Sequence, residues 1–336
     1  MALSGLLWSF LSTDFLLGLK IRFSASSLPK TQPFATPGQL NGLHGLPNLT
    51  SADYGKPSYK GVLWATSDMF FRFYNRPGLT LSSSEQELLR RDLLSVARAG
   101  LNPVPDYQCL SSRPDALDDK LILLAYSGDE DDEPSPHGSQ PVAFTSAVYL
   151  TVPDLPDGRA VLHTGLTVSS PSLQRTGIMA QLFAQLFANV IPLHPNGLWV
   201  TTLAAVLSSL VQSEKVFGKT YPRVPRGKKS LRKALPEHLT IARTISLRHR
   251  EALLISPMAT FDESTFVFRG SLDFTAAAPF RKDVDDVRFW HRDEEATDFF
   301  RGLMRKGKGD EVLLVGFVDA DQFWKAMTER MERARL

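Results

Sequence analysis

The sequence predicts a mixed α/β (α/β or α+β) protein built on one central mixed sheet that is extended at both ends of the chain. The 336 residues have ordinary globular composition, with 43% apolar and 22% charged residues. Short apolar strands alternate with amphipathic helices, and no internal repeat occurs. The length favours one enlarged domain or two small ones. We expect an N-terminal extension over 1–60, a core over 61–221, and a C-terminal α/β extension over 222–336 that completes the sheet and the acceptor pocket.

Charge and cysteine content exclude several classes of function. A net charge of +2 is too small a bias to indicate a nucleic acid partner. The single cysteine, Cys109, excludes an internal disulfide framework and a cysteine-rich metal site. We interpret it as a small apolar filler. The sequence therefore predicts a reducing, cytoplasmic location and no metal, and it leaves the oligomeric state open.

The N-terminal segment Met1–Phe23 is apolar but lacks the order of a signal peptide. No basic residue precedes the apolar run, Asp14 interrupts it, and Lys20 and Arg22 follow it. A bilayer span needs about 18 uninterrupted apolar residues. We expect a buried helix or strand here and no stable membrane insertion.

The remaining elements follow from apolar periodicity and end signals. A capping box at Ser84–Glu87 is expected to open a helix that ends at Gly100. Further helices are expected from Gly177 to Ile191 and at 205–217, 238–253, 294–305 and 320–333. Strands are expected at 61–64, 119–127, 141–152, 160–168, 198–203, 265–268 and 311–318. The acidic segment 128–139 between two of these strands is interpreted as a solvated hairpin loop, since calcium-loop spacing is absent.

The segment 160–191 carries the main functional signal. A strand ending at Val168 leads through a turn to Gln174-Arg175-Thr176-Gly177, and a helix follows with apolar residues at i, i+4 on two lines. The first N–H groups of a helix lack partners, and the helix dipole adds positive charge there. Such a turn can hold a pyrophosphate, with Gly177 allowing close backbone approach and Gln174 and Arg175 adding donors.

This strand, turn and helix resemble the GNAT acyl-CoA N-acyltransferase superfamily, whose motif Gln/Arg-x-x-Gly-x-Gly/Ala joins the fourth strand to the third helix. The match covers roughly 119–221, a third of the chain, which is also similar to uncharacterised fungal GNAT-like proteins. The resemblance implies a fifth strand at 198–203 that splays from the fourth to admit acetyl-CoA or another acyl-CoA. It implies that the cofactor-binding residues are Val168, Gln174, Arg175, Thr176, Gly177, Ile178 and Met179.

The chain departs from the family pattern at two functional positions. Met179 stands where a second Gly or Ala is expected, and no tyrosine occurs near Gln212, where the family's general acid falls. Tyr221 is the nearest downstream candidate for that acid. The departures favour an alternative in which the fold catalyses a CoA-independent cyclisation or rearrangement in secondary metabolism.

His163 is the candidate general base. It lies five residues before Val168 on the same strand, which at ~3.3 Å per residue is roughly 16–17 Å, about the reach of a pantetheine arm. The alternative is a hydrogen-bonded histidine on a half-buried strand. Thr164, Thr201 and Thr202 are candidates to orient an acceptor.

The sequence as a whole predicts an enzyme that transfers an acyl group, with acetyl expected, from acyl-CoA to an amine or hydroxyl of a small molecule. A non-catalytic acyl-CoA-binding module is a further alternative. The basic stretch from Arg223 to Lys233 is a candidate for the 3′-phosphate of CoA, although a solvated surface is the simpler interpretation.

Overall fold

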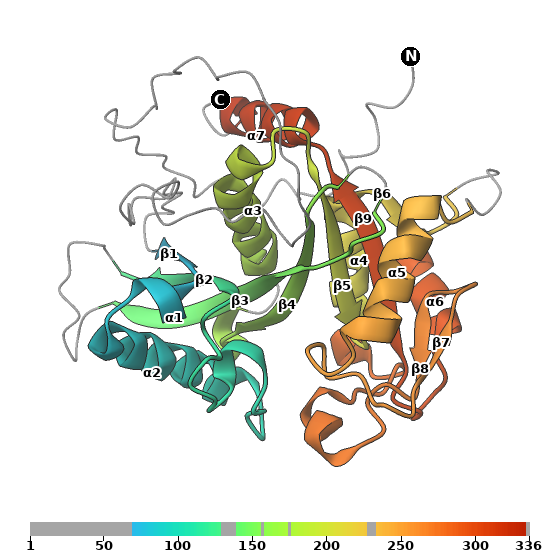
Figure 1. Ribbon diagram of the computed structural model, residues 1–336, viewed down its shortest axis with the longest axis horizontal. Helices are drawn as coiled ribbons and strands as arrows, with labels where there is room; N and C mark the ends of the chain where they lie inside the picture. The colour runs from blue at the N-terminus through green and yellow to red at the C-terminus, as the bar shows by residue number, and fades with distance from the viewer. Residues whose placement is uncertain (1–68, 129–138, 156–157, 174–175, 227–232, 334–336) are drawn as a thin grey trace, which may run out of the picture.

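The computed structural model describes residues 69–128, 139–155, 158–173, 176–226 and 233–333 (Figure 1). The apolar segment Met1–Phe23, the expected strand at 61–64, and nearly all of the acidic loop lie outside these ranges. Gln174 and Arg175 of the predicted cofactor turn also lie outside them.

One mixed sheet of nine strands forms the centre of the described chain and confirms the predicted fold class. The strands run in the order β1-β2-β3-β4-β5-β9-β8-β7, and β6 also pairs with β9. Strands β4 and β5 pair in parallel, and the other neighbours in this order pair antiparallel. The strands are β1 (Met69–Asn75), β2 (Lys120–Ser127), β3 (Gln140–Leu150), β4 (Val161–Ser169), β5 (Leu198–Ala204), β6 (Gly218–Tyr221), β7 (Thr260–Asp262), β8 (Val267–Arg269) and β9 (Glu311–Val318).

Helices cover both faces of this sheet. Figure 1 shows α2 and α3 on opposite sides of β3. The cluster on one face joins α3 and α4 to α6 and α7, while α2 and α5 pack on the other face. The helices are α1 (Pro77–Thr80), α2 (Ser83–Gly100), α3 (Ile178–Val190), α4 (Leu207–Val216), α5 (Pro236–Arg248), α6 (Glu294–Leu303) and α7 (Ala320–Arg333).

The C-terminal third contributes the middle of the sheet. Strand β9 lies directly beside β5, with Leu198 opposite Val318 and Ala204 opposite Val312. The expected core over 61–221 and the expected extension over 222–336 therefore share one sheet. Chain segments more than 100 residues apart meet along this edge, which no local pattern can specify.

Helix α3 forms as its two apolar lines predict. Ile178, Leu182, Leu186 and Val190 are all buried, as are Phe183 and Phe187 of the second line. Strand β9 and helix α7 also keep their predicted bounds. Each of these elements has a strong local signal: an apolar period in the two helices and a continuous apolar run in β9. Local sequence therefore suffices to place them.

The start of helix α2 differs from its prediction by two residues. The capping box is formed by Ser82 and Glu85, where the Glu85 carboxylate accepts from the Ser82 N–H at 2.8 Å. Ser84–Glu87 is therefore not the box. Leu88 consequently lies on the outer side, 49% exposed, while Leu89 and Leu93 face the sheet.

Within the described ranges, no helix combines the length and apolar character needed to cross a bilayer.

Candidate functional site

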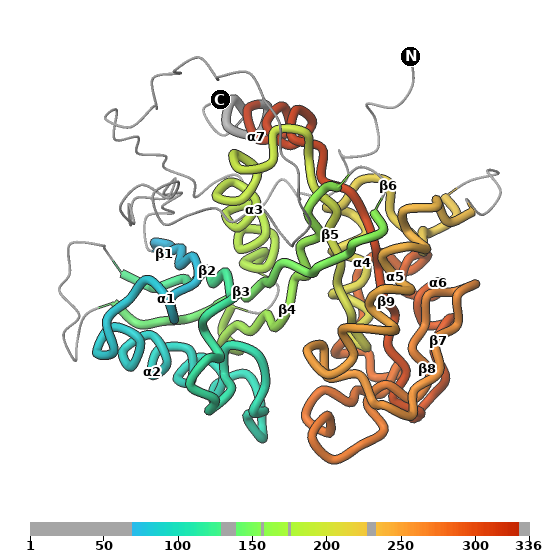
Figure 2. Tube along the Cα trace, in the orientation of Figure 1, coloured from blue at the N-terminus to red at the C-terminus, as the bar shows by residue number. Residues whose placement is uncertain are grey.

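Strands β4 and β5 part from each other halfway along β4. Their register runs from Val161 opposite Trp199 to Thr164 opposite Thr202, and β4 then continues to Ser169 paired with β3 only. Figure 2 shows the two traces separating beyond the paired segment. Parallel strands that part at their carboxyl ends leave the position where open α/β sheets bind ligands. The predicted splay of the fourth and fifth strands is therefore confirmed.

A β-bulge lies where the two strands begin to part. Thr145 of β3 is opposite Thr167, and Ala147 is opposite Thr164, so β4 has one extra residue there. The extra residue lies in Gly165–Leu166, immediately after the last pair with β5. A bulge frees a backbone group from the ladder. Here the freed group is the Leu166 N–H, which donates to the side-chain oxygen Oε1 of Gln108 at 2.7 Å.

Gln108 lies beside this bulge, at the point where β4 and β5 part, which we call the apex. Three hydrogen bonds hold its side chain there. Besides the Leu166 N–H, its Oε1 accepts from the Ser146 hydroxyl at 3.0 Å. Its Nε2 donates to the Tyr107 hydroxyl oxygen at 2.8 Å. Gly165 makes room for this side chain, because a Cβ there would overlap the Gln108 carboxamide. The result is a short polar chain that leads away from β4 towards β9.

Glu311 is the first residue of β9, and its charge acts on Tyr107 without a hydrogen bond between them among the described contacts. It is buried, and it accepts from the Ser271 hydroxyl at 2.6 Å. Burial raises the pKa of this carboxyl to about 7. Burial, and then the charge of Glu311, raise the pKa of the Tyr107 hydroxyl. A buried carboxyl whose pKa lies near neutral is a candidate functional group.

Sequence reasoning missed Gln108, Tyr107, Ser271 and Glu311. The only local signal is a charged residue opening the otherwise apolar strand Glu311–Val318. Gln108 is 58 residues from Leu166 and belongs to no pattern. Such groups become candidates only once the sheet brings them together.

The turn after β4, predicted to bind the cofactor, leads into the N-terminus of α3 at Gly177. Gly177 caps α3 at φ 84°, a left-handed conformation that glycine adopts without strain. The Thr176 hydroxyl donates to the Leu173 carbonyl at 2.7 Å and closes the turn. No acidic residue occupies the first turn of α3, so nothing offsets the positive end of the helix dipole there.

The side chains of the other predicted cofactor residues within the described ranges are buried or partly buried. Ile178 is buried, and Met179 is partly buried against the same core cluster. Val168 is 4% exposed and packs beneath the end of α2, where a Cβ on Gly100 would come within 2.7 Å of its side chain. The Val168 side chain is thus occupied by packing, which leaves its backbone as the part that can contact a ligand.

His163 lies on the paired part of β4 and is buried. Its Nδ1 lies 3.0 Å from the Thr201 hydroxyl across the β4–β5 seam. Burial, followed by the neighbouring His249, lowers the pKa of His163 to about 3. The imidazole therefore stays neutral at physiological pH, and a conjugate acid this strong makes it a weak proton acceptor.

The structure places two of the three threonines in contact across the β4–β5 pair, while their proposed role in orienting an acceptor stays a prediction. Thr201 and Thr202 are consecutive strand residues, so their side chains point to opposite faces of the sheet. The Thr201 hydroxyl contacts His163, and the Thr164 hydroxyl donates to the Thr201 carbonyl at 3.1 Å. Both hydroxyls hold the β4–β5 seam together.

Tyr221 does not join His163, which corrects its assignment as the general acid. It ends β6, opposite Val315 on the edge of β9 that faces away from β5. Strands β5 and β9 therefore lie between Tyr221 and β4. Its hydroxyl donates to the Ser264 carbonyl at 2.5 Å, which gives it a structural role.

The described part of the basic stretch is engaged in ion pairs. Arg226 contacts Glu214 at 3.3 Å and Asp293 at 3.2 Å, and Lys215 contacts Asp293 at 2.9 Å. Asp293 also caps α6 by accepting from the Ala296 N–H at 3.2 Å. These contacts tie α4 to α6. Residues 227–232 lie outside the described ranges.

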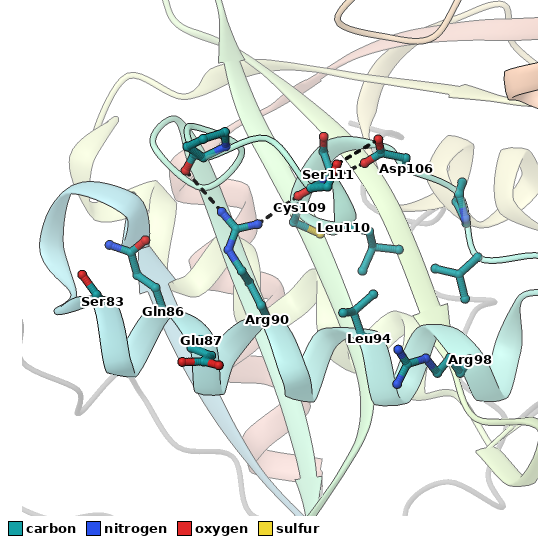
Figure 3. Close-up of a pocket in the computed structure, with 14 residues that line it drawn as sticks. Ser83, Gln86, Glu87, Arg90, Leu94, Arg98, Asp106, Cys109, Leu110 and Ser111 are labelled. Carbon is teal, nitrogen blue, oxygen red and sulfur yellow. Dashed lines mark hydrogen bonds between the residues drawn. The ribbon is translucent and has the colours of Figure 1, made fainter.

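A shallow groove of about 810 Å³ lies between α2 and the segment 104–114 (Figure 3). Arg90 spans it and donates to the Ser111 carbonyl at 2.9 Å. Cys109 borders the groove, but burial raises the pKa of its thiol to about 11, so it is not an activated nucleophile. The residues of the described ranges include no cluster of three metal-ligating side chains.

Fold and site together define an α/β protein whose mixed sheet opens between two parallel strands, next to a helix N-terminus suited to an anion. No protein-family model matches the chain, and no curated protein matches it.

Some solved structures do match. A putative GNAT-family acetyltransferase from Desulfovibrio desulfuricans is 11% identical, with 45% of this chain and 85% of that chain covered and a TM-score of 0.28. Arabidopsis thaliana NAA60 in complex with acetyl-CoA is 13% identical, with 45% and 86% covered and a TM-score of 0.31. Aminoglycoside N-acetyltransferase AAC(6')-Iy in complex with CoA is 14% identical, with 38% and 71% covered and a TM-score of 0.23. At these TM-scores the matches add nothing to the geometry above.

Proposed function

We propose that the protein binds acyl-CoA between β4 and β5 and transfers the acyl group, with acetyl expected, to an amine or hydroxyl of a small molecule. The observation that carries the proposal is the parting of β4 from β5 after Thr164, followed beyond the end of β4 by Gly177 at the start of α3. An extended thioester needs both features: an opening in the sheet for the arm and an anion site for the pyrophosphate.

In this proposal the first turn of α3 holds the pyrophosphate through backbone N–H groups. The Gly177 conformation turns the chain into the helix. Gln174 and Arg175, predicted from the sequence as further donors, lie outside the described residues. The pantetheine arm then runs along the edge of β4 that β5 has left. It passes the backbone of Val168 towards the bulge at Gly165–Leu166.

The transfer forms a bond from the acceptor nitrogen or oxygen to the acyl carbon and breaks the carbon–sulfur bond. The acceptor loses a proton, and the departing thiolate gains one. We propose that Glu311, whose pKa burial raises to about 7, takes up the proton of the acceptor and then gives it to the departing thiolate. His163, with a pKa of about 3, is too weak a proton acceptor for this role.

Calorimetric titration with CoA and acetyl-CoA tests the binding step. Gly177→Ala strains the turn and is expected to weaken both affinities about tenfold, as roughly 1.4 kcal/mol of backbone strain would. Gly158→Ala is the matched control, because Gly158 has a similar φ of 61° and nothing within 4 Å of an added Cβ. Absence of binding to the unaltered protein would reject the proposal.

Transfer to amine and alcohol libraries, followed by release of free thiol, tests the chemical step. Glu311→Gln should keep acetyl-CoA binding while lowering the rate at least a hundredfold, roughly the usual contribution of a general base. Equal rates for the two proteins would reject Glu311 as the base and leave the binding proposal intact.

A non-catalytic acyl-CoA-binding module is the second candidate. It is favoured by one observation: the polar groups at the apex already bond to one another, through Gln108 and through the His163–Thr201 contact. Binding without turnover across the libraries would support it. The single buried cysteine also supports a cytoplasmic location in either case.

A further inference from the structure

The Leu166 N–H is a buried donor at a place where a substrate would be expected. It lies in the bulge of β4, at the first residues beyond the last pair with β5. Its acceptor is a side-chain carbonyl, Gln108 Oε1, at 2.7 Å. A buried N–H without an acceptor is costly, so this position needs a carbonyl oxygen in every state of the protein.

Gln108 reaches this N–H from an unfavourable backbone conformation. Its φ is 50°, in the left-handed region that residues other than glycine seldom occupy. Strain of this kind persists only where surrounding contacts hold it, and it concentrates at functional positions. Here the contacts are the bonds from Leu166 and Ser146 and the bond to Tyr107.

The surroundings of Gln108 are built to accept its carboxamide and allow it to leave. Gly165 provides the space, since any Cβ there would overlap the carboxamide. The next two residues, Cys109 and Leu110, are buried in the core cluster that also holds Leu166, and they border the groove along α2 (Figure 3). The carboxamide is the far end of a flexible side chain, so its displacement requires its three hydrogen bonds to break and the side chain to rotate.

A primary amide carbonyl and a thioester carbonyl are alike in what they offer an N–H donor: one sp² oxygen in a planar group. We infer that Gln108 is an internal substitute for the acyl carbonyl, which occupies the Leu166 N–H in the free protein and is displaced when an acyl group binds. Gln108 is thus a specificity-determining residue that reduces the preference for acyl-CoA over free CoA. The inference rests on the proposed function.

Two substitutions take the competing carbonyl away from the Leu166 N–H. Gln108→Leu removes the carbonyl and keeps the size of the side chain. Gln108→Asn draws the carbonyl back by one methylene, in a residue that tolerates the left-handed backbone. Gln86→Leu is the matched control. Gln86 is also partly buried, and its Nε2 donates to the Gly78 and Leu81 carbonyls at 3.0 Å, but it frees no N–H at the bulge.

The experiment measures the Kd of CoA and of acetyl-CoA for each full-length protein by calorimetry. Both Gln108 variants should increase the preference for acetyl-CoA over CoA by roughly threefold to tenfold, the factor that one neutral hydrogen bond is worth. Gln86→Leu should leave the ratio unchanged. The asparagine variant keeps the test valid if the leucine variant fails to fold.

Amide hydrogen exchange over residues 165–168 gives a readout that a purely structural role would not move. Protection should be lost in the free Gln108 variants and restored by acetyl-CoA but not by CoA. An unchanged affinity ratio, or protection restored equally by CoA, would overturn the inference while acyl-CoA binding stands. Failure of the unaltered protein to bind either ligand would reject the proposed function itself.

Discussion

Strand β5 is held in different ways along its two edges. Along one edge it pairs with β9 over its whole length, from Leu198 opposite Val318 to Ala204 opposite Val312. Along the other it pairs with β4 over four residues and then leaves it. The complete β9 seam keeps β5 in the sheet, so the β4 seam can open without exposing the core. The difference shows how one strand can be fixed in the sheet along one edge and border an opening along the other.

The side chains along the two seams differ in the same sense. The β5–β9 seam is dominated by apolar side chains such as Val200, Leu314 and Phe317. At the β4–β5 seam, His163, Thr164 and Thr201 form polar contacts, and Gln108 follows at the apex. Apolar burial stabilises without requiring particular partners, whereas buried polar groups need defined ones. The predictions below test this contrast, from the largest expected effect to the smallest.

Deprotonation of Glu311, the first residue of β9, should lower the free energy of unfolding. Burial raises the pKa of Glu311 from its usual 4.5 to about 7. The folded protein thus holds this proton more tightly than the unfolded chain does. The associated stability is complete below pH 4.5 and is lost as the pH rises through 7. The loss is on the order of 3 kcal/mol of unfolding free energy.

Glu311→Gln mimics the neutral form and should remove this loss. Urea unfolding of both proteins between about pH 4.5 and 8 measures it. His163, whose pKa is lowered to about 3, contributes an opposite trend to both proteins and cancels in the difference. Glu87→Gln, at an exposed site on α2, is the control. Parallel pH profiles for Glu311→Gln and the unaltered protein would contradict the prediction.

Strand β9 should resist added volume at Gly316, where Phe217 and β6 pack against it. A Cβ on Gly316 would lie 2.6 Å from the Cβ of Phe217 and 3.1 Å from the Gly218 carbonyl oxygen. Because neither neighbour can swing away, Gly316→Val should lower the unfolding free energy by about 2 kcal/mol. Chemical denaturation measures it. Gly302→Ala, with no neighbour within 4 Å, should be neutral or slightly stabilising, and equal losses for both would contradict the prediction.

The polar contact across the β4 seam should matter less than the apolar seam. Thr201→Val keeps the shape of the side chain but leaves Nδ1 of the buried His163 without its partner. We expect a loss of about 1.5 kcal/mol in unfolding free energy, measured by denaturation at neutral pH. Thr328→Val, which removes an exposed hydroxyl on α7, is the control. A neutral outcome at Thr201 would show that the contact adds nothing to the seam.

The apex of the β4 seam should tolerate an added methyl group best. Gly165→Ala places a Cβ against the Gln108 carboxamide, the far end of a flexible side chain that can move aside. The expected loss is about 1 kcal/mol, less than at Gly316, together with faster exchange of the Leu166 amide. Denaturation and hydrogen exchange measure the two effects. A loss as large as that of Gly316→Val would show that the apex is as rigid as the closed seam.

Elements with strong periodicity can be predicted from sequence because their signal is local. The two apolar i, i+4 series of α3 predict a helix, and the continuous apolar run of β9 predicts a buried strand. In both cases the residues of the element itself are sufficient. Strands β1, β6 and β7 are not among the predicted strands. β6 and β7 have only four and three residues, too few to show a period. The sequence places the capping box two residues late because Ser84 and Glu87 have the same spacing as Ser82 and Glu85.

The candidate site can be predicted only in part. Gly177 is predicted because a glycine between a strand and a helix is typical of a tight turn, and its φ of 84° agrees. Residue type and distance along the chain group Tyr221 with His163, and the sheet places β5 and β9 between them. Thr201 does lie beside His163, but as its hydrogen-bond partner. Sequence spacing does not say which face of a sheet a side chain occupies, or which strand comes to lie between two others.

The sequence by itself determined the strand, turn and helix from β4 through Gly177 to α3, because neighbouring residues set their backbone and apolar period. Only the tertiary structure decided what faces the opening between β4 and β5. Gln108 meets Leu166, and Ser271 meets Glu311, across 58 and 40 residues of chain. Contacts that distant depend on the packing of the whole sheet, and no local propensity encodes them.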